Sequence, residues 1–485
     1  MHRSLRTVSG IAAFAGLAAL MIVEAVPVAR AQGAAAAATK RNYKDNGEYD
    51  LFSKAFTDAQ NPAAQIKDLE TWAQKYPDSD YKDVRTGMLV QAYNSLTPPQ
   101  PAKVLDLASQ LLTKDLKTVF DDPQQGKRLT LSFLYATSVA VGAVGSAAVP
   151  SPAPAQVELW RTAAKSLKEE AKAYFVAANK PAGASDADWA KAHATYDAVA
   201  NHALLVLLIF PAEAAMAKSP RVPAECRDIA EPAYRRALTE FPEQTYVSYV
   251  LAQALQCQQK EFPAKVFQAV YEYERAAVVD PNLGGAQPDA TKVPAYADKA
   301  YVNIHGSPDG LDDLKVQVKL SALPPDGFTF KTAREIADEQ QAKFKESNPE
   351  LAMWMDIRAN LTDPAVPNYF EEQLKDVEGP TLKGTVVDGA CRGKEITVAF
   401  PMPGQSGALT PEVRLKFTDP TPIAGKPTPN VEITFQKAVA TAFTKDPFML
   451  TMEVKKADVE GLKTTPCVPA ATKKATPPAP PPAKK

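Results

Sequence analysis

The chain has 485 residues, longer than the roughly 250–300 residues that one hydrophobic core usually serves, so two or more folding units are expected. Its 55 Lys and Arg residues balance 56 Asp and Glu residues, which argues against nucleic acid or an anionic membrane as the partner. The 22 glycines and 42 prolines are typical of a helical array with many helix ends.

The N-terminus predicts export. Arg3 and Arg6 form a short basic region, residues 11–23 are almost wholly apolar, and residues 29–31 form a small-x-small cleavage site. We interpret residues 1–31 as a removable signal peptide, which places the mature chain in the periplasm or outside the cell. The alternative is an uncleaved membrane anchor, but the apolar run is short for the about 20 residues that a span needs.

Residues 32–45 are alanine-rich and then polar, and we expect a flexible linker there. Apolar residues at helical spacing then predict a helical array over residues 46–300. Residues 129–149 lack charge and could be interpreted as a membrane span, but serine, threonine and glycine dilute them, and we expect a buried helix. Residues 203–210, ended by Pro211, are too short to cross a bilayer. No integral span is therefore expected after signal cleavage.

Four cysteines in an exported chain suggest disulfides, and four cysteines allow three pairings. Cys226 and Cys257 both lie in the helical region, whereas Cys391 and Cys467 bracket most of a β-rich region. Since each pair can close within its own folding unit, we expect Cys226 with Cys257 and Cys391 with Cys467. Four free, buried thiols are the alternative, which an oxidising compartment disfavours.

Two segments of the helical region end in the same way, with two alanines seven residues apart and a proline five residues further on: Ala230, Ala237 and Pro242, then Ala269, Ala276 and Pro281. This pattern resembles the second helix of the tetratricopeptide repeat (TPR), in which small residues let paired helices approach and a proline ends the unit. The two prolines are 39 residues apart, against about 34 in the family, and we place the excess at residues 258–263. The alternative is two unrelated helices that both end in proline. The resemblance implies a helical solenoid that binds protein through a concave surface.

Residues 301–377 predict less regular helices, at 311–320, 332–344 and 349–361. In the last of these, Met353, Trp354 and Ile357 are expected to form the buried face. The pattern then alternates over residues 378–462, where we expect a small β-domain. Five short strands separated by Gly/Pro-rich turns are predicted at 382–387, 395–400, 412–417, 431–435 and 448–454. Five strands fit a small barrel, which resembles the oligonucleotide/oligosaccharide-binding fold, and a small sandwich fits almost as well. Residues 463–485 predict a disordered Pro/Ala/Lys tail, which a cell-wall polymer could bind.

Motifs for chemistry are mostly missing. His193 and His202 are nine residues apart, which places them on opposite faces of a helix. Ser185 resembles a helix N-cap, so a metal site at the nearby Asp186 and Asp188 is the weaker interpretation. Residues 389–395 imitate a phosphate loop with one residue too few between the glycines, so we expect a hairpin turn. We expect no catalytic residue, no metal and no cofactor.

The predicted fold is mainly α, with a TPR-like helical solenoid followed by a small five-stranded β-barrel or sandwich domain. The function that fits best is a non-catalytic exported scaffold that binds a protein or peptide partner through the helical array. A cell-wall or carbohydrate-binding protein that uses the β-domain is one alternative. An enzyme whose site is assembled from residues distant in sequence is the other. Nucleic acid is the least expected partner.

Overall fold

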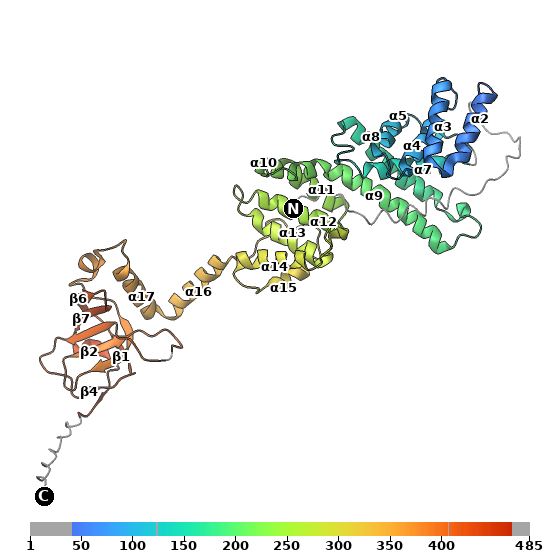
Figure 1. Ribbon diagram of the computed structural model, residues 1–485. Helices are drawn as coiled ribbons and strands as arrows, with labels where there is room; N and C mark the ends of the chain where they lie inside the picture. The colour runs from blue at the N-terminus through green and yellow to red at the C-terminus, as the bar shows by residue number, and fades with distance from the viewer. Residues whose placement is uncertain (1–40, 123–124, 406, 468–485) are drawn as a thin grey trace, which may run out of the picture. The chain divides into compact units, whose positions relative to one another are not determined.

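The computed structural model describes residues 41–122, 125–405 and 407–467 and divides the chain into two compact units, residues 1–332 and 333–485 (Figure 1). The expected signal peptide, most of the linker at 32–45 and most of the tail at 463–485 lie outside the described residues. The boundary between the units falls inside the range 301–377, which we assigned to irregular helices. Each unit has its own hydrophobic core.

Unit 1 begins with a group of helices around one core, which contains Trp72, Phe133 and Trp160. Side chains cap some of these helices: Asp45, for example, accepts a hydrogen bond from the backbone N–H of Glu48 at the start of α2. Proline occupies the first turn of others, where its missing N–H is tolerated. The helices are α2 (Asn46–Thr57), α3 (Pro62–Lys75), α4 (Lys82–Ser95), α5 (Pro101–Leu111), α6 (Leu116–Val119), α7 (Gly126–Val141) and α8 (Pro154–Tyr174). The uncharged segment 129–149 thus contributes α7 to this core, although the helix ends at Val141.

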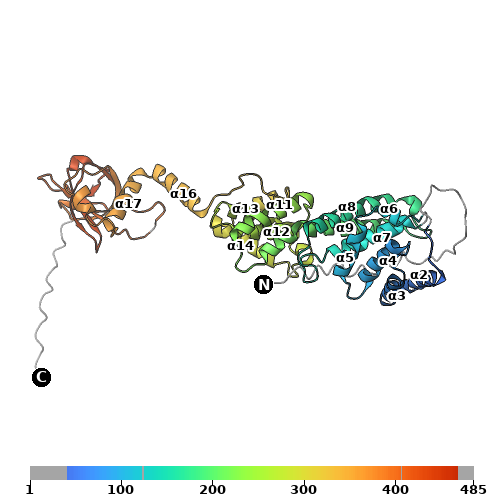
Figure 2. The same ribbon diagram turned by 90° about the horizontal axis from the view of Figure 1, so that it is seen from above.

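The long helix α9 (Asp186–Met216) joins this group to the rest of unit 1 (Figures 1 and 2). Ser185 is its N-cap and accepts a hydrogen bond from the backbone of Asp188, as expected. Our expectation that Pro211 ends the helix was wrong. Ile209 and Ala212 are buried on either side of the proline, and this packing outweighs the loss of one backbone hydrogen bond. Among the described residues, α9 is the one helix long and apolar enough to cross a bilayer, and 61% of its most apolar window is buried inside the unit.

A second group of helices follows and packs around its own core. Both views show α11 to α14 together beside the end of α9 (Figures 1 and 2). The elements are α10 (Pro223–Glu225), the π-helical turn η5 (Cys226–Ala230), α11 (Glu231–Glu240), α12 (Thr245–Cys257), α13 (Lys265–Val279), α14 (Lys292–His305) and α15 (Leu311–Gln317). The loop between α12 and α13 contains residues 258–263, where we placed the excess over the TPR period.

Unit 2 contains α16 (Ala333–Ser347), α17 (Pro349–Thr362), the π-helical turn η7 (Phe370–Leu374) and nine strands among its described residues. Seven strands form one mixed sheet in the order β6-β7-β3-β2-β1-β5-β8, and β4 pairs with β9 in a separate ribbon. Neighbours in the sheet are antiparallel except β3 and β7, which run parallel. The strands are β1 (Leu382–Gly389), β2 (Glu395–Ala399), β3 (Val413–Phe417), β4 (Lys426–Pro427), β5 (Glu432–Phe435), β6 (Val439–Thr444), β7 (Met449–Val454), β8 (Val459–Glu460) and β9 (Thr464–Thr465).

The five predicted strands are β1, β2, β3, β5 and β7, but the count of five was short by four. β6 and the two-residue strands β4, β8 and β9 were not predicted. β9 also lies within residues 463–485, so the described start of the expected tail pairs with the β-domain. One face of the sheet packs on α17, where the ring of Trp354 stacks on Phe400 at 4.2 Å between centroids.

Candidate functional site

The repeat residues of the sequence pattern meet in the second core of unit 1. Ala230, Ala237, Ala269 and Ala276 are all buried there, at most 2% exposed. Pro242 and Pro281 follow the ends of α11 and α13. The small side chains let α11, α12 and α13 pack closely, which leaves one face of α12 uncovered by its own core.

That face of α12 carries Tyr246, Tyr249, Gln253 and Gln256, at positions i, i+3, i+7 and i+10 of the helix. Gln256 is exposed and the other three are half-buried, whereas Val247, Leu251 and Leu255 of the same helix are fully buried. Side chains from neighbouring elements extend the face. We call the whole set the tyrosine face: Glu213 of α9, Arg221, the four α12 residues, Tyr273 of α13 and Tyr296 of α14.

Three aromatic rings form a continuous row on this face. Tyr249 meets Tyr273 edge to face at 5.5 Å between centroids, and Tyr273 meets Tyr296 in the same manner at 4.8 Å. The hydroxyls of Tyr273 and Tyr296 both donate to the side-chain oxygen of Gln256, at 3.0 and 3.3 Å. Tyr273 is buried, but Tyr296 is 42% exposed. The row is therefore rigid at its base and accessible at its edge.

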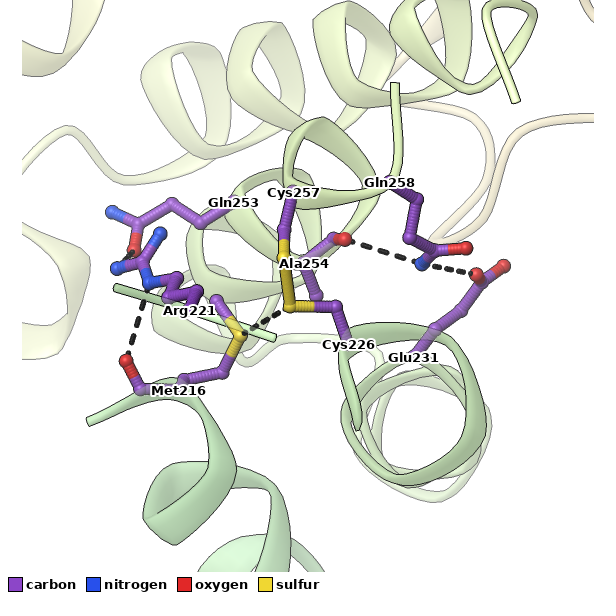
Figure 3. The surroundings of a disulfide bond; sticks show 8 residues. All are labelled: Met216, Arg221, Cys226, Glu231, Gln253, Ala254, Cys257 and Gln258. Atoms are coloured by element: carbon purple, nitrogen blue, oxygen red, sulfur yellow. Dashed lines mark hydrogen bonds between the residues drawn. A yellow bond between two sulfur atoms is a disulfide. The ribbon is translucent and has the colours of Figure 1, made fainter. Parts of the chain in front are cut away.

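Hydrogen bonds orient the side-chain amides of Gln253 and Gln256 so that their NH2 groups remain available to a ligand. Arg221 donates to the side-chain oxygen of Gln253 at 2.8 Å and to the backbone carbonyl of Met216 at 3.2 Å (Figure 3). Because a guanidinium group can only donate, it orients the Gln253 amide with its NH2 group directed elsewhere. Within the described part of the chain, the NH2 groups of Gln253 and Gln256 donate no hydrogen bond to another side chain or to the backbone.

Glu213 supports the face from below. Its two carboxylate oxygens accept hydrogen bonds from Tyr234 at 2.9 Å and from Tyr246 at 3.1 Å. Burial raises the pKa of Glu213, and the two tyrosine hydroxyls act against that shift. Burial and the nearby carboxylate in turn raise the pKa of Tyr246 far above its usual value. Both tyrosines therefore stay protonated as donors and are fixed in orientation.

A disulfide fastens one end of the face. Cys226 in η5 and Cys257 at the end of α12 are bonded, with Cα atoms 6.3 Å apart. Arg221 with Gln253 lies on one side of this bond, and Gln258 with Glu231 lies on the other (Figure 3). The second expected pair, Cys391 and Cys467, also lies at bonding distance, with Cα atoms 5.9 Å apart.

On the far side of the disulfide, three donors converge on the carboxylate of Glu231. Lys265 donates at 2.6 Å, Arg235 at 2.8 Å and Gln258 at 2.8 Å. Burial raises the pKa of Glu231, but the donors outweigh burial and leave that pKa lowered. This network links α11 to the start of α13, and it stabilises the helix group rather than presenting free donors.

The residues considered for chemistry do not assemble a reactive centre in the described parts of the chain. His193 lies 3.6 Å from Asp197 on α9, and His202 is buried, which lowers its pKa. Residues 389–395 join the antiparallel strands β1 and β2, as expected for a hairpin turn. In the described ranges, no group of three or more His, Cys, Asp or Glu residues is placed so that it could hold a metal ion. Asp186 and Asp188 therefore do not belong to such a group.

The described part of each unit contains a small cleft. One, of about 220 Å³, is lined by Leu105, Asp106 and Trp160 among others, and one in unit 2, of about 110 Å³, lies beside α17 and η7. Each has one acidic residue in its wall and no histidine. Neither cleft has the converging acids or histidines that would favour the enzyme interpretation.

Comparison with known proteins adds no template for this site. No family model, no curated protein and no solved structure matches the chain. The geometry of the tyrosine face is therefore the main indication of function.

Proposed function

We propose that the protein is an exported, non-catalytic scaffold that binds a protein or peptide partner through the tyrosine face of a TPR-like helical array. The observation that carries the proposal is the row of Tyr249, Tyr273 and Tyr296 beside the side-chain amides of Gln253 and Gln256. Tyrosine offers a large, rigid contact area at low entropic cost, and it is enriched where proteins bind each other. The amide groups add donors for the backbone carbonyls of a partner.

The position of the face in the array supports this proposal. Such arrays bind partners through a concave surface, and α12 is paired with α13, the helix with the best match to the repeat pattern. The four buried alanines are the contacts that such a pair of helices needs. A TPR-like arrangement of α11 to α14 is thus part of the proposal.

Export to the periplasm or beyond the cell is supported by the cysteines. Two pairs at bonding distance are what an oxidising compartment allows, and they hint at an exported chain. The amino-acid pattern of residues 1–31 points in the same direction.

The glycan-binding alternative receives no comparable support. It calls for aromatic side chains clustered on an exposed face of the β-domain. In the described part of unit 2, every aromatic side chain is buried or half-buried, including Trp354, Phe400 and Phe435 in the core. We keep retention on purified wall polymer as an outcome of the test below.

Site-specific photocrosslinking tests the proposal. The photoreactive residue p-benzoylphenylalanine is introduced at Tyr296 of the full-length chain, and irradiation is carried out in the organism's own exported fraction. A matched protein carries the same residue at Tyr49 of α2, which is 53% exposed and lies outside the face. We expect a discrete protein adduct from position 296 and none from position 49.

Substitution of the face supplies the second readout. The double variant Tyr249→Ala/Tyr296→Ala should no longer capture the same partner, whereas Tyr49→Ala should capture it normally. Equal adducts from both positions, no adduct at all, or retention on wall polymer alone would overturn the proposal. Retention on the polymer would favour the glycan-binding alternative.

A further inference from the structure

We propose that Glu274 of α13 and Asp298 of α14 share one proton, and that this carboxyl pair holds α14, with its Tyr296, on the tyrosine face. The inference rests on the proposed function, because it names what regulates binding at the same face. Loss of the shared proton to solvent releases α14 from α13. A rise in pH therefore acts against binding at the tyrosine face.

The two carboxyls meet at the interface of α13 and α14. Glu274 is fully buried and has Asp298 as its hydrogen-bonding neighbour. Both oxygens of Glu274 and the Oδ1 atom of Asp298 are buried, and within the described ranges none of them accepts a hydrogen bond of good geometry. Two ionised carboxylates can only accept, so they leave these atoms unsatisfied. One proton between them makes Glu274 a donor to Asp298.

The surrounding charges favour one shared proton over none. Lys315 of α15 forms an ion pair with Asp298 at 2.6 Å, and Asp312 acts on the same lysine. The other titratable group that interacts with Glu274 is the neutral Tyr301 of α14. With one proton the pair has a single negative charge, which Lys315 balances, whereas without it two buried negative charges repel each other. Burial and Asp298 accordingly raise the pKa of Glu274 to about 8, and Lys315 acts against that shift.

α14 has few other attachments, so the carboxyl pair matters for its position. Three of its 14 residues are buried, namely Val293, Ala297 and Tyr301. By contrast, nine of the 15 residues of α13 are buried. Asp298 directly follows Ala297 at the centre of this narrow contact. Elements with little buried apolar surface are the ones that open locally, before the rest of a core unfolds.

Movement of α14 would alter the tyrosine face directly. Tyr296 lies two residues before Asp298, its ring packs on Tyr273 at 4.8 Å between centroids, and its hydroxyl donates to Gln256 at 3.3 Å. The other two rings of the row belong to α12 and α13, which keep their own core. Release of α14 therefore removes one ring from the row and leaves a partner with a smaller contact.

The direction of the pH effect follows from proton linkage. Glu274 has a pKa of about 8 when α14 is closed, and the ordinary value of 4.5 applies once the carboxyl reaches water. The closed form thus binds more protons between these two values, and a rise in pH favours the open form across this window. From pH 6 to pH 8 the ratio of open to closed α14 should increase by about fiftyfold.

Hydrogen–deuterium exchange of the full-length chain tests the carboxyl pair. The protection of the α14 amides is measured at pH 6 and pH 8 and corrected for the intrinsic exchange rate. In the parent chain this protection should fall by about fiftyfold. In Glu274→Gln it should stay constant, because the amide donates to Asp298 and has no proton to lose. Asp298→Asn, whose amide donates to the Glu274 carboxylate, should also reduce the loss and guards against a folding defect in the first variant.

Glu272→Gln is the matched control. Glu272 is as buried as Glu274 on the same helix, but it interacts with Ser248 and Arg275 and not with a second carboxyl. The α14 amides of this variant should lose protection with pH as the parent does. An equal flattening by Glu272→Gln and Glu274→Gln would show that α14 exchanges by unfolding of the whole helix group, and it would overturn the inference. The inference also fails if the protection of α14 in the parent does not depend on pH.

Photocrosslinking from position 296 at the same two pH values connects the carboxyl pair to the face. Capture of the partner should decrease from pH 6 to pH 8 in the parent chain and persist at pH 8 in Glu274→Gln. Equal capture by the parent at both pH values would overturn regulation through α14 and leave the proposed function intact. If α14 exchanges as expected but no partner is captured at either pH, the proposed function fails and the exchange data still support the carboxyl pair.

Discussion

Glu272 and Glu274 lie inside unit 1 on α13, with both side chains fully buried. No oxygen of either carboxyl has a hydrogen-bond partner of good geometry among the described residues, although Ser248 lies near Glu272 and Asp298 lies near Glu274. Arg275 does not fill this role for Glu272, since its guanidinium donates to Ser248 at 2.6 Å and to the carbonyl of Pro242. Burial raises the pKa of each carboxyl to about 8, and the neighbouring Asp298 adds to the shift of Glu274.

These two carboxyls predict a stability that falls as the pH rises. A carboxyl with a higher pKa in the folded chain binds more protons folded than unfolded between its two pKa values, here about 4.5 and about 8. The free energy of unfolding should therefore decrease across this window, by on the order of 1 kcal/mol per pH unit for each carboxyl. Thermal unfolding of unit 1, measured from pH 5 to pH 8, checks this prediction.

The double variant Glu272→Gln/Glu274→Gln should flatten that decrease. Glu213 and His202 remain in the variant, so the difference between the two curves isolates the two α13 carboxyls. Glu240→Gln serves as control, because Glu240 forms an exposed pair with Arg236. Parallel curves for the parent and the double variant would contradict the prediction.

For single residues, the sequence predicts some roles and burial states correctly and others wrongly. The capping role of Ser185 follows from local chemistry alone, because the hydroxyl bonds a backbone group three residues away. On α17 the helical pattern predicted Met353, Trp354 and Ile357 as the buried face. Trp354 and Ile357 are buried, but Met353 is 47% exposed. Adjacent apolar residues point about 100° apart on a helix, so only the packed sheet decides which of them is covered.

At the scale of elements, long periodic segments were predictable and short or interrupted ones were not. β1, β2, β3, β5 and β7 have buried apolar residues at alternate or neighbouring positions, which mark them in the sequence. β6 consists mostly of alanine and threonine and has one fully buried residue, so its sequence carries little strand signal. Its place at the sheet edge comes from pairing with β7. Pro211 misled the prediction of α9 because tertiary packing overrode a local helix breaker.

The disulfides act on separate elements and predict separate effects. Cys226–Cys257 ties η5 to the end of α12 in unit 1, and Cys391–Cys467 ties the β1–β2 turn to a residue two positions beyond β9 in unit 2. Replacing either pair with serine should lower the free energy of unfolding by about 2–4 kcal/mol, chiefly by releasing the unfolded chain. Calorimetry of the full chain should show the loss in the transition of one unit only. A pair whose removal shifts both transitions would contradict separate cores.

At the scale of the whole molecule, the division into two units predicts a pattern of proteolysis. α16 opens unit 2 without one buried residue, and Arg334, Lys343 and Lys345 lie along it. Limited trypsin digestion should therefore cut first between residues 331 and 345 and release two stable fragments, which mass spectrometry identifies. First cuts inside α12 or inside the sheet would contradict the assignment of two cores.

The tyrosine face shows why the site was harder to predict than the fold class. Tyr246, Tyr249, Gln253 and Gln256 recur at helical spacing in the sequence, but our sequence analysis of this region used only the alanines, prolines and cysteines. Arg221 and Tyr296 come from other elements and join the face only through tertiary packing. No residue of the tyrosine face was therefore predicted from the sequence.

The bond between Cys391 and Cys467 has a mechanical consequence. Cys467 directly precedes the proline-rich tail, and Cys391 sits in the turn between two strands of the seven-stranded sheet. Tension applied to the tail would pass through this covalent link into the β1–β2 hairpin, and β8 and β9 would not be peeled away one residue at a time. Unit 2 would thus resist being unravelled from its end, as an anchor point for a chain under load must.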